Sequence, residues 1–185
     1  MAERQRVTHG FPPFYCADSR LLILGSFPSV KSRAQAFFYG HPQNRFWPVM
    51  ARLCGEDTPL TVPERAAFLE RNRIALYDVL EACTIVGSSD SSIRDVVVND
   101  LTPILSLSRV GRIFVNGKTA EKLYRRYTEP TLGIRAVCLP STSPANAAWS
   151  LQRLTEAWRQ RIFDQEYFKQ RGNQNGKDTD ALLHL

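Results

Sequence analysis

The stretch LLILGSFPSVKSRAQAFFYGHPQNRFW, residues 21–47, decides the fold expected for this chain. Its first four residues form a continuous apolar run, typical of a strand buried on both faces of a parallel sheet. Gly25, Pro28 and Gly40 then interrupt regular structure. Because ligands bind beyond the carboxyl ends of strands in open α/β sheets, a site is expected among the polar and aromatic residues that follow. These residues are Ser26, Phe27, Ser29, Tyr39, His41 and Asn44.

Strand and helix patterns alternate through the rest of the chain. Three further apolar runs predict strands, at residues 74–80, 112–115 and 134–139. Helices are predicted at residues 44–53, from 61, at 118–127 and from about 147, with a weaker helical pattern at 100–107. Asn44 can cap the first helix, and Thr61 with Glu64 forms a capping box at the second. Right-handed crossovers between such units predict an α/β fold, a three-layer α/β/α sandwich around a mainly parallel four-stranded sheet.

The length of 185 residues suits one domain with a sizeable core, expected over residues 1–170. The paired prolines of FPPFY, residues 11–15, suggest an extended arm that packs aromatic rings on this domain. Residues 171–185 are polar and rich in turn formers, so we expect a flexible tail. No apolar run approaches the length of a membrane span, and the N-terminus lacks a signal-peptide core. We therefore expect a soluble cytoplasmic protein without a membrane partner.

The chain carries an excess of positive charge, with 24 lysines and arginines against 18 acidic residues and a formal charge of +6. This excess favours a polyanionic partner, but it also serves solubility, and charge alone leaves both interpretations open. Cys16, Cys54, Cys83 and Cys138 lie far apart, without the closely spaced pairs of a zinc site. We expect four reduced thiols, no metal and no cofactor.

The segments GSFPS at 25–29 and FYGHPQNRFW at 38–47 resemble the first motif region of the uracil-DNA glycosylase superfamily. The likeness is closest to its mismatch-specific branch and to the related hypoxanthine-DNA glycosylases. Three further segments fall in the order and approximate spacing of that family: ALYDVL at 75–80, RIFVNGKTA at 112–120 and LPSTSPANAAW at 139–149. The resemblance covers roughly residues 11–162, and HPQNRFW is its most specific part.

The resemblance implies an enzyme that extrudes a base and holds it by stacking and by hydrogen bonds to its edge. Tyr39 matches the family's stacking aromatic, whereas Phe37 and Phe38 fit core packing better. The family commonly places Asn or Asp in the first turn to orient a water, but Phe27 occupies that position here. Asn44 is then the best substitute as the catalytic amide, to orient water or to contact a purine edge, and a helix-cap role is compatible with this function.

The same motifs supply the other candidate residues. Base contacts are expected from Ser26, Phe27, Tyr39 and His41, although a histidine before a proline more often braces a loop. Backbone amides of a helix expected after Pro144 would suit a phosphate or a developing base anion. The DNA contacts expected from these loops are Ser29, Lys31, Ser141, Ser143, Pro144 and Asn146. Further candidates for pocket or backbone contacts are Asn116, Gly117 and residues 90–92.

The resemblance implies a monomeric, nucleoid-associated DNA glycosylase of base excision repair that acts on damaged DNA and hydrolyses the N-glycosidic bond of a deaminated base. Hypoxanthine is the expected base, and uracil or a mismatched base is the alternative. Lys31 offers a second enzymatic interpretation, as the amine nucleophile of a glycosylase-lyase. A non-enzymatic interpretation is a nucleic-acid binding module that lost hydrolysis with the substitution to Phe27.

Overall fold

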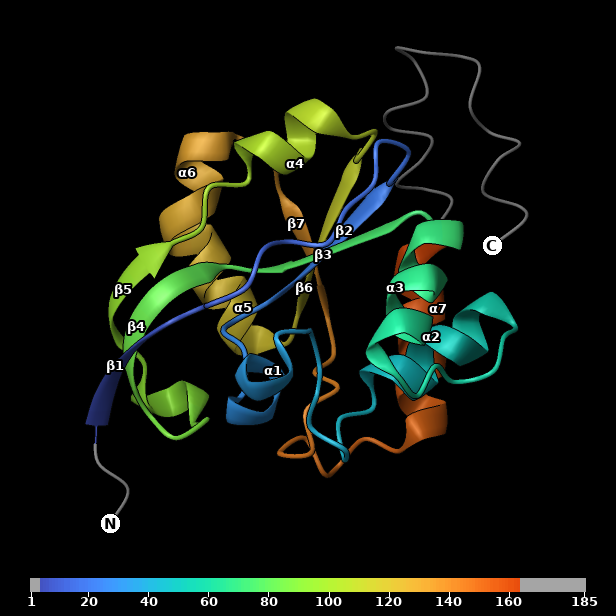
Figure 1. Ribbon diagram of the computed structural model, residues 1–185, viewed down its shortest axis with the longest axis horizontal. Helices are drawn as coiled ribbons and strands as arrows, with labels where there is room; N and C mark the ends of the chain where they lie inside the picture. The colour runs from blue at the N-terminus through green and yellow to red at the C-terminus, as the bar shows by residue number, and fades with distance from the viewer. Residues whose placement is uncertain (1–3, 164–185) are drawn as a thin grey trace.

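The computed structural model describes residues 4–163, in which a parallel sheet forms the centre of the domain (Figure 1). This sheet has four strands in the order β3-β2-β6-β7. Their bounds are Leu21–Gly25 (β2), Ile74–Asp78 (β3), Arg112–Asn116 (β6) and Ala136–Leu139 (β7). Leu21 of β2 pairs with Ile74 on one side and with Arg112 on the other, in parallel register. The four-stranded parallel sheet predicted from the apolar runs is therefore confirmed.

Helices cover both faces of this sheet, as Figure 1 shows. One layer consists of α2 (Phe46–Cys54), α3 (Val62–Arg71) and α7 (Leu151–Ile162). The opposite layer consists of α4 (Thr102–Leu107), α5 (Lys118–Leu123), a π-helix (Tyr124–Thr128) and α6 (Glu129–Leu132). Successive residues of β2 serve the two layers, because Ile23 joins the core cluster of Phe46 and Trp158 whereas Leu22 joins that of Tyr124. The predicted three-layer sandwich is confirmed.

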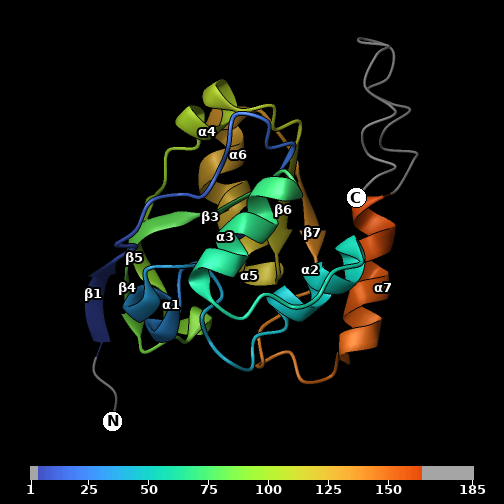
Figure 2. The ribbon, with the colours of Figure 1, turned by 45° about the vertical axis from the view of Figure 1, so that its right-hand side comes forward.

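A second sheet, absent from the sequence-based prediction, lies beside the first (Figure 2). It is antiparallel, in the order β1-β4-β5, with strands Arg4–Thr8, Leu80–Val86 and Arg94–Val98. The single strand predicted at 74–80 in fact ends at Asp78, and the chain then passes into β4. Val79 marks the change, because its amide donates to the carbonyl of Gly25 (2.9 Å) and its carbonyl accepts from the amide of Asn99 (2.9 Å).

Several local predictions can be compared directly with the structure. Gly55 ends α2 in a left-handed conformation (φ 69°), and the capping box of Thr61 and Glu64 begins α3, both as predicted. The aromatic arm packs as predicted, since Phe11 is buried and Phe14 forms a β-bridge with Leu76. A short helix, α1 (Val30–Gln35), was not predicted. The predicted boundary at residue 170 and the tail at 171–185 lie outside the described residues.

No helix within residues 4–163 has the length and apolar character needed to cross a membrane.

Candidate functional site

The site residues gather at the carboxyl edge of the parallel sheet. The strands β2, β3 and β6 end there at Gly25, Asp78 and Asn116. The loop that follows β2 and the loop that follows β7 meet at this edge, which lies at the lower end of the molecule in Figure 1. Hydrogen bonds join the two loops between residues almost one hundred positions apart, such as the bond from the Arg45 amide to the carbonyl of Thr142 (3.1 Å). The edge expected from the fold is therefore where the motif loops come together.

Asn44 and Asn116 are joined through the hydroxyl of Thr142, which is fully buried. Asn116 Nδ2 donates to Thr142 Oγ1 (2.9 Å), and Thr142 Oγ1 donates in turn to Asn44 Oδ1 (2.9 Å). The backbone amide of Thr142 also donates to Asn116 Oδ1 (3.1 Å). The sequence did not identify Thr142 as a site residue, although it lies within the second motif, residues 139–149.

The orientation of the Asn44 carboxamide follows from its partners. The amide of Phe46 can only donate, and it lies 3.0 Å from Asn44 Oδ1, so this atom is the oxygen. With the Thr142 hydroxyl on the same oxygen, both of its lone pairs are engaged. The Asn44 Nδ2 group donates to no described residue. Asn44 thus binds the first amide of α2, close to the predicted cap role, and leaves its N–H groups available.

Arg45 holds the second loop in place, a role that the sequence did not suggest. Its guanidinium donates to the carbonyls of Ser143 (2.6 Å), Asn146 (3.0 Å) and Thr142 (3.4 Å), and also to that of Trp149. The loop therefore wraps around a single cationic side chain next to Asn44. The only available signal was the position of Arg45 within HPQNRFW, the most specific part of the motif.

The helix predicted to begin after Pro144 does not form there. Residues 143–149 form turns, and α7 begins at Leu151 with Ser150 as its cap (Ser150 Oγ accepts from Arg153 N–H, 3.2 Å). A helix N-terminus therefore cannot stabilise a base anion at this position, and that part of the prediction is wrong. The reason is local, because the hydrogen bonds of this segment go to side chains and to Arg45 instead of to a helix ladder.

The predicted contact residues of the second loop hold its own backbone. Ser141 Oγ accepts from the amide of Ser143 (3.2 Å), and Asn146 Nδ2 donates to the carbonyl of Ser141 (2.9 Å). Ser143 Oγ accepts from the amide of Ala145 (3.2 Å), and Pro144 is exposed. Ser141, Ser143 and Asn146 therefore shape the loop, and contact of all four residues with DNA stays a prediction.

Tyr39 has one ring face covered. It stacks on Phe46 with ring centroids 3.9 Å apart and an interplanar angle of 14°. Burial of the hydroxyl, together with the charge of Asp78, raises the pKa of Tyr39. The ring remains partly exposed overall, so a stacking contact with a base stays a prediction. Phe37 and Phe38 are buried in the core, as expected.

The other predicted base contacts differ in exposure. Phe27 is only 8% exposed and packs into the second core cluster, with the Arg33 guanidinium 5.4 Å from its ring centroid. His41 Nδ1 accepts from the amide of Gln43 (3.2 Å), which is the loop-bracing role considered above. Ser26 Oγ donates to Asp90 Oδ1 (3.0 Å), which brings a carboxylate to the first motif turn. Direct contact of these residues with a base stays a prediction.

The predicted phosphate contacts of the first loop lie on α1. Ser29 caps this helix, because its Oγ accepts from the amide of Ser32 (3.2 Å). Lys31 is exposed in the first turn.

Beneath the site, Asp78 forms a buried pair with His9. His9 Nε2 lies 2.8 Å from Asp78 Oδ2, and both side chains are less than 10% exposed. His9 Nδ1 donates to the carbonyl of Phe11 (2.9 Å), which holds the ring on the aromatic arm. Gly25 packs directly over the carboxylate, since a Cβ there would lie 2.2 Å from Asp78 Oδ1. Sequence alone could not pair two residues that are 69 positions apart.

Asp90 completes the edge from the other side. It lies in the 3-10 helix Asp90–Ser92, within the β4–β5 loop. That loop is tied to α1 and to β4, because Ser88 Oγ accepts from the amide of Val30 (3.1 Å) and Ser92 Oγ from that of Val86 (2.8 Å). Desolvation of the carboxyl group and the charge of Asp78 raise the pKa of Asp90. Within residues 4–163, no group of three or more His, Cys, Asp or Glu side chains could hold a metal ion.

Comparison with known proteins places this geometry in a family. The model of the uracil DNA glycosylase superfamily matches residues 12–164. A protein named hypoxanthine DNA glycosylase from Methanosarcina acetivorans is 34% identical over 155 residues, which cover 81% of this chain and 95% of the relative. One of the same name from Methanosarcina barkeri is also 34% identical, over 80% of this chain and 94% of the relative. The solution NMR structure of a M. acetivorans protein described as a uracil DNA glycosylase has a TM-score of 0.70 at 33% identity, over 85% of this chain and 97% of its own. The chain belongs to the uracil DNA glycosylase superfamily.

Proposed function

We propose that this chain is a monofunctional DNA glycosylase that hydrolyses the N-glycosidic bond of deoxyinosine in damaged DNA. Two relatives with this activity in their names share 34% of their residues with it over about four fifths of its length. The single observation that carries the proposal is the fixed Asn44 carboxamide, which keeps its N–H groups free at the carboxyl edge of the sheet. On this proposal the protein acts as a monomer on chromosomal DNA, and hence at the nucleoid.

Asn44 would act on the base and not on the water. Its oxygen already accepts two hydrogen bonds, so it has little capacity to orient a nucleophilic water. A purine that departs from the sugar gathers negative charge on its ring nitrogens and on its carbonyl oxygen, which are hydrogen-bond acceptors. A preorganised N–H donor stabilises that charge most in the transition state. This assignment fits hypoxanthine, whose edge carries several such acceptors.

The water would be oriented by Asp90. The family's usual amide or carboxylate in the first turn is replaced here by Phe27, which cannot polarise water. Asp90 reaches the same turn from the β4–β5 loop through its hydrogen bond from Ser26. When ionised, its carboxylate can accept a proton from a water held at this turn. Asn44 would thus stabilise the departing base, and Asp90 would orient the attacking water.

Single-turnover cleavage of duplexes that contain one deoxyinosine, uracil or alkylated base tests the proposed substrate. Deoxyinosine should react fastest, and strand breaks should appear only after alkali or heat, because a monofunctional enzyme leaves an abasic site. A borohydride-trapped adduct that disappears in Lys31→Ala would establish the lyase alternative instead. Binding without cleavage of any base would establish the non-catalytic module.

Asn44→Asp separates the donor role from the cap role. The aspartate keeps acceptor oxygens for Phe46 N–H and for Thr142, but it removes the N–H donor. Cleavage should fall by roughly 10²-fold or more, the scale for loss of one preorganised donor, while the melting temperature changes little. Asn44→Ser, which keeps a single capping oxygen, should lose the same activity. A wild-type rate in either variant would show that the amide donor is not catalytic.

A further inference from the structure

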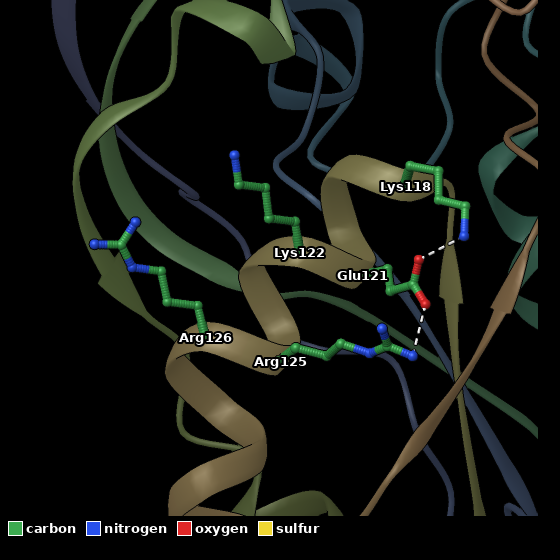
Figure 3. A pocket seen from close by; sticks show the side chains of 5 residues that line it. All are labelled: Lys118, Glu121, Lys122, Arg125 and Arg126. Atoms are coloured by element: carbon green, nitrogen blue, oxygen red, sulfur yellow. Dashed lines mark hydrogen bonds and ion pairs between the residues drawn. The ribbon is translucent and has the colours of Figure 1, made fainter.

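A group of cations on the helical layer opposite α2 has no part in the site described above. Residues 118–126, on α5 and the π-helix, carry four lysines and arginines and one glutamate. Their side chains line an open hollow of about 430 Å³, and a second hollow of about 300 Å³ beside Arg125 adds Arg135 and Glu129. Figure 3 shows the first of these hollows. We call this surface the basic track, formed by Lys118, Lys122, Arg125, Arg126 and Arg135.

The charges of the basic track are only partly balanced. Glu121 is 11% exposed at its side chain and bridges Lys118 (2.8 Å) and Arg125 (3.0 Å), as the dashed lines in Figure 3 mark. It therefore orders two cations while it neutralises one charge. Among the described residues, no carboxylate lies within ion-pair distance of the three remaining cations of the track: Lys122, Arg126 and Arg135. Such a surplus of exposed cations favours an anionic partner.

The track matches the dimensions of a nucleic-acid backbone. Eight residue steps from Lys118 to Arg126, at about 1.5 Å each, span about 12 Å. This corresponds to roughly three to four base-pair steps along the axis of a duplex, at about 3.4 Å each. The π-helix that carries Arg125 and Arg126 is a rare element, which occurs mostly as single-turn insertions in α-helices and frequently at functional sites.

The track also begins beside the candidate site. Gly117, which precedes it, packs so closely on the second loop that a Cβ there would lie 2.9 Å from Ser141 Cβ. From this point α5 leads away from the carboxyl edge along the outer layer. The basic track therefore starts at the same edge of the sheet as the candidate site.

We propose that the basic track binds the phosphates of the duplex that flanks the excised nucleotide and supplies sequence-independent affinity for DNA. That this duplex is the substrate DNA rests on the proposed function. An acidic protein is the less suitable partner, because protein interfaces depend on apolar or aromatic anchors. The large exposed hydrophobic residues of the described chain lie on other elements: Val30, Leu60, Val97 and Leu107.

The double variant Lys122→Gln/Arg126→Gln tests the track, because neither cation has a carboxylate partner that its loss would leave unpaired. The matched control is Arg52→Gln/Arg109→Gln, which removes two exposed arginines on α2 and on the loop before β6. The affinity of each protein for a labelled duplex is measured over a series of salt concentrations. Each lost phosphate contact should lower the slope of log affinity against log salt by about 0.9, so the track variant should lose about 1.8 and bind roughly 10-fold or more weakly near 0.1 M salt.

The control variant should keep the wild-type slope, and single-turnover cleavage by the track variant at saturating protein should be unchanged. An unchanged slope in the track variant, or an equal loss in the control, would overturn the proposal. Deoxyinosine cleavage by the wild-type protein is followed on the same samples. Cleavage with no change of slope refutes the track alone, whereas a lowered slope without cleavage of any base refutes the proposed function and retains the track.

Discussion

Replacement of Arg45 by methionine should open the second loop while it leaves the sheet intact. Methionine keeps much of the apolar stem of the side chain but removes every donor to the carbonyls of Thr142, Ser143, Asn146 and Trp149. A hydrogen bond to a charged group contributes about 1.5–3 kcal/mol, but these four share one guanidinium and are not additive. Ser143, Asn146 and Trp149 are partly exposed, so water replaces some of the lost bonds to their carbonyls. We expect a loss of about 2–4 kcal/mol in the free energy of loop opening.

Amide hydrogen exchange of residues 140–150 measures this loss directly. At 1.36 kcal/mol per tenfold change, exchange should accelerate by about 30-fold to 1000-fold in Arg45→Met. Thr142 supports Asn44, so single-turnover cleavage of deoxyinosine should fall by roughly 10-fold to 100-fold as well. Arg52→Met is the matched control, because Arg52 is exposed on the same segment of chain. Loop exchange within about threefold of wild type in Arg45→Met would show that Arg45 does not hold the second loop in place.

Two further substitutions test the close packing of Gly25 on Asp78 and the electrostatic contribution of Glu56 to stability. Gly25→Ala should cost about 1–3 kcal/mol of stability and reduce cleavage, because the new Cβ would collide with the buried Asp78 carboxylate, whereas Gly111→Ala, with open space around it, should be nearly neutral in a thermal melt. For Glu56, burial alone would raise the pKa, but hydrogen bonds from Arg71 and Asn72 outweigh it and hold the pKa below its usual value. Because the pKa of Glu56 is lower in the folded than in the unfolded chain, where it is near 4.3, ionised Glu56 stabilises the fold above that pH. This stabilisation is lost as the pH falls through the folded pKa. Glu56→Gln should therefore lower the free energy of unfolding by about 1 kcal/mol near neutral pH, and its stability should converge with that of wild type in acid. A gap that persists in acid would show that the carboxylate is not its source.

The parallel sheet could be predicted because its physical signal is local. Strands buried on both faces must be apolar at every position, as in the four residues before Gly25. The antiparallel sheet lacked such a signal. β1 reads RQRVT and is mostly exposed, so its pairing with β4 depends on register with a strand about eighty positions away and not on an apolar pattern. The start of α7 was misplaced for a similar reason, since Pro144 and Asn146 suit turns as well as helix starts.

The candidate site was predicted in outline because its loops follow the strands directly. Its decisive contacts were not predictable, since they join distant positions. Arg45 reaches residues up to 104 positions away, and Asp78 meets His9 from the N-terminal segment. A sequence shows which side chains can donate or accept, but only the fold determines which of these groups are already engaged. Asn44 is the clearest instance, because its oxygen was expected to orient water and instead accepts from Phe46 and Thr142.

The antiparallel sheet offers a physical reason for the departure at Phe27. Phe27 belongs to the second core cluster, together with Cys83 and Ile85 of β4, so its position in the turn has become a packing position between the two sheets. A carboxylate at that position would lose its hydration among the apolar side chains of this cluster, at a cost of several kcal/mol. The β4–β5 loop of the same sheet delivers Asp90 to Ser26, one residue before Phe27. On the proposed function, packing against the antiparallel sheet explains the apolar residue in the first motif turn, and a loop of the same sheet supplies a carboxylate to that turn. Asp90→Asn should therefore lose activity while its folding stays intact.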